Sequence, residues 1–342
     1  MKGWKYCFLI CGVTIVLADD YGAEVYTKEA FRFGRFEARM CMAAASGTVS
    51  SMFLYYPESY AGDPEPWREI DIEVLGKSPA KFQSNIITGY AGEQTTSEAL
   101  HTVDPATNVS YHTYAVEWTP DYVAWSVDSV EIRRDTGEQV TDLQDEDQTL
   151  RFNLWASTST SWAGAWSDTV LPQYQFINWV RVYSYDSSSG FSLLWQDDFN
   201  EWDASVWAAG NWTFTGNRIT FTAENAVVQD GFLILALTDD NTGFSGNAPI
   251  DDSSSTILGS TSSKAPFLLR YGGGRIQVFG ETCPSCHVMA RTLDGRQIAS
   301  RNLSGNRTDL LLGKYPDGII LVSIESADKI WTSALFRVGT SN

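Results

Sequence analysis

Histidine is scarce in this chain, and that scarcity excludes several kinds of active site. The only histidines among its 342 residues are His101, His112 and His287, and none stands beside a serine or cysteine in a nucleophile pattern. Phosphate-binding loops and glycine-rich dinucleotide fingerprints are also absent from the sequence. Any chemistry must therefore come from other side chains.

Cysteine is also sparse. Cys7 and Cys11 lie near the N-terminus, and Cys41 lies in the strand-like run FEARMCMAAASG, where we expect an inert packed thiol. Cys283 and Cys286 have the spacing of a redox motif, but the sequence after them alternates like a strand, whereas that motif needs a helix. A local disulfide is therefore favoured over half a zinc site or redox chemistry.

Basic residues are few, with 24 Lys and Arg against 42 Asp and Glu, which gives a formal net charge of -18. Such a surface repels phosphates, which argues against nucleic acid and anionic membranes as partners. Aromatic residues, by contrast, are abundant, with 13 Trp and 15 Tyr. Their rings stack well on the apolar faces of sugars, although for any single tryptophan a place in a β-sheet core is the more common alternative.

Long apolar runs are absent except at the start of the chain. Lys2 and Lys5 precede an apolar run over 6–17, and the small residue Ala18 follows. This pattern predicts a secretory signal peptide over 1–18 and a secreted protein, because the run is shorter than the roughly 20 residues of a membrane span. A membrane anchor is the alternative; we expect no membrane insertion of the mature chain.

Amphipathic helices longer than two turns are also missing. Short alternating runs such as YAVEWT, LRFNLWAS and FLILALT are separated by turn residues, which predicts an all-β protein with two large stacked sheets over 22–240. Residues 241–265 are rich in Ser, Gly, Asn and Pro and predict a flexible linker. Residues 266–342 hold further short strands and predict a second, smaller β-sandwich.

The run WREIDIEVLG, residues 67–76, crowds three carboxylates onto one predicted strand. Glu69, Asp71 and Glu73 share a face, while Ile70 and Ile72 point into a core. At about 3.3 Å per residue, the α-carbons of the two glutamates lie roughly 13 Å apart. Their carboxyl groups reach the about 5 to 5.5 Å of a retaining glycosidase only by leaning toward each other above Asp71.

This arrangement favours acid–base catalysis on a glycosidic bond. One glutamate would attack as the ionised form and the other would donate a proton, while the aspartate between them couples to both. The alternatives are a solvated strand face, which usually mixes Lys, Thr and Ser with the acids, and a calcium site, which needs loop spacing with a Gly turn.

At these residues the sequence resembles glycoside hydrolase family 16, whose hallmark is Glu-x-Asp-x-Glu on a strand of a concave, concanavalin A-like jelly roll. The uninterrupted form EIDIEVLG is similar to that of lichenases, the endo-1,3-1,4-β-glucanases; laminarinase-type members usually carry an extra residue. Other segments resemble lichenases in their proper order: FGRFEARMCMAAASGTVSSMFLYY, KFQSNIITGYAG, YHTYAVEWTPDYVAWSVD, LRFNLWAS and FINWVRVYSY.

Residues 193–238 resemble the part that opens an ordinary lichenase, although here they follow the part that closes one. The resemblance therefore implies a circularly permuted catalytic domain, similar to the permuted lichenases of fibre-digesting rumen bacteria. Permutation is tolerable where the original termini lie close together at the surface.

The resemblance also implies roles for individual residues. Glu69 matches the nucleophile, Glu73 the general acid/base and Asp71 the assisting acid. Positions that line the family's glucan cleft are matched by Phe53, Tyr55, Gln83, Asn85, Arg151, Asn153, Trp155 and Trp212. Three further tryptophans, Trp67, Trp162 and Trp179, are expected nearer to the core or the rim.

A structural calcium on the convex side is common in the family, and its ligand positions are matched by Asn178, Asp198 and Gly231, the last two through backbone carbonyls. No cofactor is implied for the chemistry itself. The loop 56–66 at the cleft edge and the C-terminal module lie outside the clean match. The module resembles sorting domains of type IX secretion, which would place the protein at the cell surface; a carbohydrate-binding module is the alternative.

The sequence thus predicts a monomeric, secreted, retaining endo-1,3-1,4-β-glucanase whose partner is mixed-linkage β-glucan. Two alternatives remain open. One is another family specificity, for laminarin or xyloglucan, and the other is a non-catalytic glucan-binding lectin.

Overall fold

The computed structural model describes residues 20–240, 243–249, 251, 257–260, 267–272, 275–280, 286–292, 297–303, 307–311, 318–325 and 330–338. Strands dominate these residues, and the longest α-helix among them, α1 (Glu138–Asp142), has 5 residues. The prediction of an all-β jelly roll is confirmed. The predicted signal peptide, residues 1–18, lies outside the described residues.

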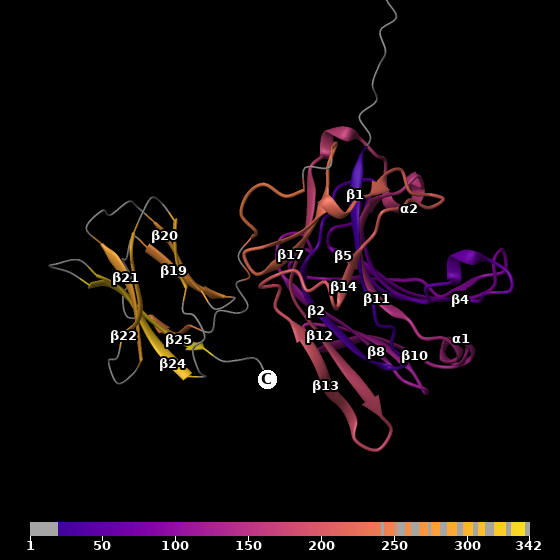
Figure 1. Ribbon diagram of the computed structural model, residues 1–342, viewed down its shortest axis with the longest axis horizontal. Coiled ribbons are helices and arrows are strands. Elements are labelled where there is room, and N and C mark those ends of the chain that lie inside the picture. Colours follow the sequence, from indigo (N-terminus) through magenta and orange to yellow (C-terminus); the bar gives the residue numbers. More distant parts are fainter. Residues whose placement is uncertain are drawn as a thin grey trace, which may run out of the picture.

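The sheet that carries the carboxylates has the strand order β14-β1-β11-β3-β4-β5-β6, with β15 beside β1 and β7 beside β5. Figure 1 labels β14, β1, β11, β4 and β5 of this sheet. Its strands are β14 (Trp207–Ala209), β1 (Tyr21–Thr27), β11 (Thr149–Ala156), β3 (Thr48–Tyr55), β4 (Trp67–Leu75), β5 (Lys81–Gly89), β6 (Thr95–Thr96), β15 (Thr220–Phe221) and β7 (Ala99–Thr102).

The second sheet has the order β10-β9-β8-β2-β12-β17-β16, with β13 beside β12. It comprises β10 (Val130–Asp135), β9 (Val123–Val127), β8 (His112–Trp118), β2 (Gly34–Cys41), β12 (Gln173–Asp186), β17 (Phe232–Leu237), β16 (Ala226–Gln229) and β13 (Gly190–Asp197). Short helices occupy the connections: η1 (Ser59–Ala61), η2 (Leu143–Asp145), α2 (Thr160–Ala163), η3 (Asp168–Val170) and η4 (Ala223–Asn225).

The main core lies between the two sheets. Ile70, Ile72 and Val74 on β4 are fully buried and pack in one cluster with Trp125 of β9 and Phe36 of β2. Burial of each such side chain contributes about 1.5–3 kcal/mol, so the inward face of β4 is firmly fixed. Because side chains alternate along a strand, this burial forces the three acids onto the opposite face.

The two ends of the jelly roll lie side by side. The backbone N–H of Tyr21 donates to the carbonyl of Thr238, and that of Thr238 donates back to Tyr21, each at 2.9 Å. A hairpin joins β12 to β13, which pair over residues 180–186 and 190–197. Chain ends that meet in this way are the arrangement that a circular permutation requires.

The predicted linker over 241–265 is wrong at its start. Phe244 packs edge-on against Tyr174 and Phe176, with ring centroids 4.8 and 5.6 Å away. Asp251 forms a two-pronged ion pair with the buried Arg39, at 2.8 and 2.9 Å. Residues 243–249 and 251, here called the strap, therefore belong to the jelly roll. Their polar composition suggested a linker, but apolar and charged contacts far along the chain hold them.

The C-terminal part forms two small sheets, as predicted. One has the order β18-β25-β24-β21-β22 and the other β19-β20-β23, and β19 contacts β25 while β22 contacts β23. The strands are β18 (Ile257–Ser260), β25 (Ile330–Val338), β24 (Gly318–Glu325), β21 (His287–Thr292), β22 (Gln297–Asn302), β19 (Phe267–Gly272), β20 (Arg275–Gly280) and β23 (Arg307–Leu311). The linker prediction is also wrong at 257–260, because β18 pairs with β25.

The cysteine predictions are confirmed in part. Cys41 is a buried free thiol, and burial raises the pKa of this thiol to about 12, which makes it unreactive. Cys286 is disulfide-bonded, while Cys283, its predicted partner, lies outside the described residues. Within the described part of the chain, no helix is long and apolar enough to cross a membrane.

Candidate active site

Strand pairing fixes where the three acids lie. On β3, Tyr55 is opposite Glu69, Phe53 is opposite Asp71 and Ser51 is opposite Glu73. On β5, Asn85 is opposite Asp71 and Gln83 is opposite Glu73. Residues opposite one another share a face of the sheet, so the acids stand in a field of polar and aromatic side chains.

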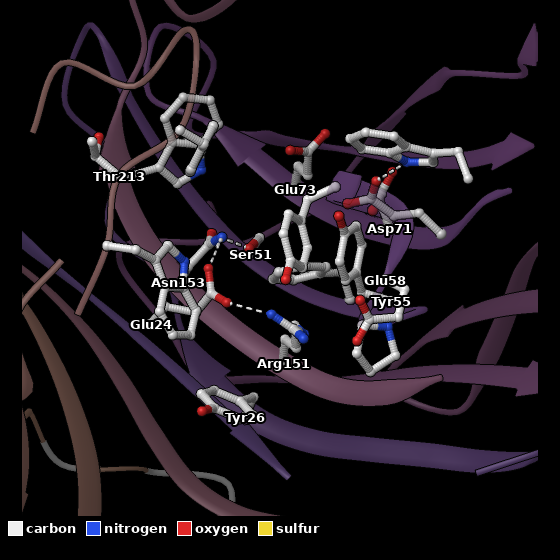
Figure 2. A pocket seen from close by; sticks show the side chains of 18 residues that line it. Glu24, Tyr26, Ser51, Tyr55, Glu58, Asp71, Glu73, Arg151, Asn153 and Thr213 are labelled. Atoms are coloured by element: carbon white, nitrogen blue, oxygen red, sulfur yellow. Dashed lines mark hydrogen bonds and ion pairs between the residues drawn. The ribbon is translucent and has the colours of Figure 1, made fainter. Parts of the chain in front are cut away.

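This face opens into a cavity of about 710 Å³, and the three acids line it. Six of the eight residues that the sequence assigned to the cleft line it as well: Phe53, Tyr55, Arg151, Asn153, Trp155 and Trp212. Figure 2 shows Asp71 and Glu73 on one side of the cavity and Arg151, Asn153 and Glu24 on the other. Carboxylates on the floor and aromatic rings around them suit a carbohydrate chain.

The other two predicted cleft residues do not line the cavity. The amide nitrogen of Gln83 donates to Glu98, and its amide oxygen accepts a hydrogen bond from Trp162 at 2.9 Å. The amide oxygen of Asn85 accepts from the backbone N–H of Ser97 at 3.0 Å. Both residues lie opposite the acids on the neighbouring strand, but their amides are engaged with other side chains and backbone. They therefore border the acids without facing the cavity.

Sequence reasoning missed two further carboxylates that line the cavity, those of Glu24 and Glu58. Glu24 of β1 accepts a hydrogen bond from Arg151 at 2.8 Å and from Asn153 at 3.4 Å, and Ser51 donates to the amide oxygen of Asn153 (Figure 2). Burial raises the pKa of Glu24 although Arg151 opposes that rise. In the sequence YGAEVYT, Glu24 and Tyr26 are two residues apart, so both lie on the same face of the strand. This spacing could have indicated a polar strand face.

Other cavity residues come from two connecting segments. Pro57, Glu58 and Tyr60 lie in the loop before β4, and Thr213 and Phe214 follow Trp212. The side chain of Tyr60 is 74% exposed although it borders the cavity. The sequence assigned no role to this loop, because loop residues carry no periodic pattern from which a facing direction can be derived.

Trp67 was expected toward the core or the rim, and it is half-buried. Trp67 lines the cavity, and its indole N–H donates to Glu69 at 2.7 Å. Trp162 packs against Trp155, with ring centroids 5.8 Å apart. Trp179 lies on β12 of the other sheet, where Arg181 stacks over its ring at 4.2 Å. Because side chains alternate along β4, Trp67 lies on the same face as the three acids, and the sequence alone could have predicted this.

The three acids titrate far above their ordinary range. Burial raises the pKa of Glu69 to about 7, while hydrogen bonds from Trp67 and Asp71 oppose the rise. Burial, with the charges of Glu69 and Glu98, raises the pKa of Glu73 to about 8. The pKa of Asp71 is well above its usual value because of burial and both glutamates, so Asp71 holds a proton that it shares with Glu69. Hydrogen bonds from Trp67 and Asp71 favour the ionised form of Glu69, whereas the charges around Glu73 favour its protonated form.

The predicted calcium ligands lie on or directly beside three neighbouring strands of the second sheet. Asn178 lies on β12 between the stretch paired with β17 and the stretch paired with β13. Asp198 directly follows β13, and Gly231 directly precedes β17. An amide oxygen and backbone carbonyls are donors that suit Ca²⁺. The Asn178 amide nitrogen donates to Asp251 at 2.9 Å, which orients that amide.

A serine–histidine pair exists outside the cavity. Ser84 and His101 lie 2.7 Å apart, but Ser84 is fully buried opposite Ile72 on the core side of the sheet. A nucleophile there has no access to substrate, so the pair is structural.

Comparisons with known proteins identify the family of the chain. The model of the family "Glycosyl hydrolases family 16" matches residues 10–181. A beta-glucanase of Fibrobacter succinogenes is 54% identical over 246 residues, which cover 70% of this chain and 70% of that protein. A beta-glucanase of Brevibacillus brevis is 33% identical over 166 residues, which cover 48% of this chain and 61% of that protein.

Among solved structures, a Bacillus licheniformis beta-glucanase has 32% identity and a TM-score of 0.40, covering 46% of this chain and 69% of that one. The matched family model, the long match to the Fibrobacter protein and the acid triad on its strand lead to one conclusion: the chain belongs to glycosyl hydrolases family 16.

Proposed function

We propose that the protein is a secreted β-glucanase, specifically an endo-1,3-1,4-β-glucanase of the licheninase type that cleaves β-1,4 bonds next to β-1,3 linkages. The observation that carries the proposal is the placement of Glu69, Asp71 and Glu73 on the floor of an open cavity of about 710 Å³ with aromatic walls. The relatives named beta-glucanases support the substrate class.

The proposed reaction retains the configuration at the anomeric carbon. The Glu69 carboxylate attacks that carbon, the bond to the leaving oxygen breaks, and Glu73 gives its proton to that oxygen. Water then attacks the anomeric carbon while Glu73 takes a proton from it, and the bond to Glu69 breaks, so Glu69 leaves as a carboxylate. The surroundings support these roles, because Trp67 and Asp71 stabilise the charged form of Glu69, while burial and the charges of Glu69 and Glu98 keep Glu73 protonated.

Asp71 assists the nucleophile in this scheme. Its proton lies on the hydrogen bond to Glu69, so it stabilises the negative charge of Glu69 before attack and again when Glu69 leaves. Full ionisation of all three acids on one buried face would be costly, which favours a proton on Glu73 and a second proton between Asp71 and Glu69.

Product analysis tests the proposed specificity. We expect the full chain to release short oligosaccharides from barley β-glucan and lichenan, and little from laminarin, xyloglucan or carboxymethyl cellulose. Faster release from laminarin or xyloglucan would assign another specificity of the family. Binding of lichenan without any product on prolonged incubation would instead identify a lectin.

Two variants test the assigned roles. Glu69→Gln should abolish turnover without loss of folding, since only the nucleophile is lost. Glu73→Ala should recover activity with azide or with substrates that have good leaving groups, because only the protonation of the departing oxygen is missing. Retention is checked by NMR, which should show the β-anomer as the first product.

We also propose a bound calcium at Asn178, Asp198 and Gly231, where oxygen donors from three segments meet. Calcium there would tie β12 to the neighbouring chain segments and stabilise the fold without entering the reaction. A chelator should lower the melting temperature, and added Ca²⁺ should restore it. An unchanged melting temperature after removal of trace metal would contradict this site.

Export of a monomer, and retention at the cell surface by the C-terminal sheets, remain part of the proposal. Fractionation of the producing cells tests the location, and sedimentation tests the monomer. Loss of surface attachment on deletion of the two C-terminal sheets would identify them as the sorting module, whereas loss of polysaccharide binding would identify a carbohydrate-binding module.

A further inference from the structure

Arg133 lies on β10 at the edge of the second sheet and does not line the cavity. Its guanidinium stacks over the Trp125 ring at 4.7 Å. It also donates to the backbone carbonyl of Ser84 at 3.1 Å and to the hydroxyl of Ser97 at 3.1 Å. Asp135 pairs with the guanidinium and holds its plane. Arg133 thus bridges the two sheets at the edge nearest β5.

One contact of Arg133 leads to the backbone of the catalytic strand. The indole N–H of Trp125 donates to the carbonyl oxygen of Asp71 at 2.9 Å. Trp125 is fully buried, so this hydrogen bond is shielded from water. The guanidinium covers one face of the indole and restricts the movement of the ring.

A second contact leads to the carboxyl group of the same aspartate. Ser97, whose hydroxyl accepts from Arg133, donates its backbone N–H to the amide oxygen of Asn85 at 3.0 Å. That bond turns the amide nitrogen of Asn85 away from Ser97, and Asn85 donates to the Asp71 side chain opposite it. An amide has one donor end and one acceptor end, so fixing one end fixes the other.

We propose that Arg133 is a positioning residue for catalysis, which holds Asp71 in place through Trp125 on its backbone and through Ser97 and Asn85 on its carboxyl group. The inference rests on the proposed glucanase function, because it assigns Arg133 a role in that reaction. Arg133 contacts neither substrate nor the reacting atoms, and it acts only through these intermediates.

The measurable consequence concerns the ionisation of Glu69. Asp71 donates to Glu69 and stabilises its charged form. The other ionisable groups around the acids are Glu73 on the same strand, Tyr55 on β3, Arg151 on β11, Glu24 on β1, and Glu98 before β7. Arg133 makes none of these contacts directly, and its own charged neighbours are Asp135 and His101. A displaced Asp71 therefore weakens one hydrogen bond to Glu69 and raises the pH at which Glu69 ionises.

The experiment compares two neighbouring arginines in the full chain. Arg133→Met removes the guanidinium and keeps the aliphatic stem. Arg134→Met is the matched control, because Arg134 also stacks on an aromatic ring, Tyr122 at 3.6 Å, and also pairs with an acid, Glu131 at 2.6 Å, but it leads to no catalytic residue. Hydrolysis of lichenan is measured from pH 5 to pH 9, together with the melting temperature.

For Arg133→Met we expect an acidic limb displaced upward by about half a pH unit or more. This shift corresponds to a kcat about threefold lower or more near pH 6, with KM within about twofold. Arg134→Met should keep the wild-type pH profile. Ser97→Ala removes only the hydroxyl that Arg133 binds, and should displace the acidic limb in the same direction. In the Ser97→Ala background, Arg133→Met should displace the acidic limb by less than it does in the wild-type background.

An acidic limb of Arg133→Met that coincides with wild type, whatever its melting temperature, would overturn the proposal. If Arg133→Met does not fold, an unmoved limb in Ser97→Ala overturns it equally. Failure of the proposed function is distinguishable, since the wild-type chain would then release no product from lichenan at any pH.

Discussion

The indole nitrogen of Trp67 and a carboxylate oxygen of Glu69 are joined by a hydrogen bond of 2.7 Å, two residues apart on the same face of β4. A donor at this distance stabilises the charged carboxylate, so it counteracts the burial that raises the pKa of Glu69. The strand that presents Glu69, the proposed nucleophile, therefore also supplies a hydrogen bond that favours its ionised form.

Trp67→Phe should move the acidic limb of the pH profile upward. Loss of a hydrogen bond to a charged group costs about 1.5–3 kcal/mol, which corresponds to about tenfold or more in kcat/KM below the pKa of Glu69. The deficit should shrink toward pH 8, where Glu69 is ionised in either enzyme. Trp162→Phe is the control, because Trp162 donates to Gln83. A pH-independent deficit would point to lost packing instead.

The wild-type enzyme should be most active in a narrow range near pH 7 to 8. Activity requires Glu69 ionised, with a pKa of about 7, and Glu73 protonated, with a pKa of about 8. These values predict a bell-shaped profile of kcat/KM with limbs near them. Initial rates on lichenan across pH 5 to 9 measure it. A profile that stays flat down to pH 5 would contradict the proposal that activity requires the ionised carboxylate of Glu69.

Glu73→Gln should stabilise the fold, and more so at high pH. Burial raises the pKa of Glu73 from the usual 4.5 to about 8, so the folded state binds a proton that the unfolded state has released. Stability then falls as the pH rises from about 4.5 to about 8. The neutral amide removes that dependence, and we expect a melting temperature higher by a few degrees at pH 8 and nearly unchanged at pH 4.5.

The control for Glu73→Gln is Glu138→Gln, which neutralises an exposed glutamate on α1. Scanning calorimetry of both variants at the two pH values separates the local effect from the general loss of one negative charge. Equal gains in the two variants would mean that the net charge of -18, rather than burial at the active site, sets the pH dependence.

Tyr60 should bind a glucosyl unit beyond the catalytic centre. Its ring borders the cavity and is 74% exposed, so a sugar can stack on it. Tyr60→Ala should raise KM for lichenan about three- to tenfold, which corresponds to about 0.5–1.5 kcal/mol of aromatic contact. Turnover of short aryl oligosaccharides should not change. Tyr90→Ala is the control, because Tyr90 is 49% exposed and does not line the cavity.

The direction of the side chains on β4 could be predicted, because it follows from the alternation of residues within the strand itself. Alternation along β4 places Glu69, Asp71 and Glu73 opposite the buried isoleucines without reference to any other segment. Glu24 could not be identified in this way, because its role follows from Arg151, 127 positions away. The residues of the loop before β4 have no alternating pattern, so the sequence could not show which of their side chains face the cavity.

The strap illustrates the same limit at the level of domains. Its composition resembles a linker, but Phe244 and Asp251 bind residues that lie far away in the sequence, with 212 positions between Asp251 and Arg39. A pair of charges so far apart carries no local pattern. Only the folded sheet brings Arg39 and Asn178 to the same carboxylate.

The strap should stabilise the jelly roll mainly through Asp251. Its carboxylate and the Arg39 guanidinium are both buried, so Asp251→Ala leaves a buried positive charge without its main partner. Loss of one partner of a buried pair costs about 3 kcal/mol or more, which denaturant unfolding of the full chain can measure. The control is Asp147→Ala, since Asp147 pairs with Arg32 on the surface at 2.5 Å. That exposed pair should contribute below about 1 kcal/mol. Similar small losses in the free energy of unfolding of both variants would show that the strap contributes little to stability. The jelly roll would then end near residue 240, as its composition first suggested.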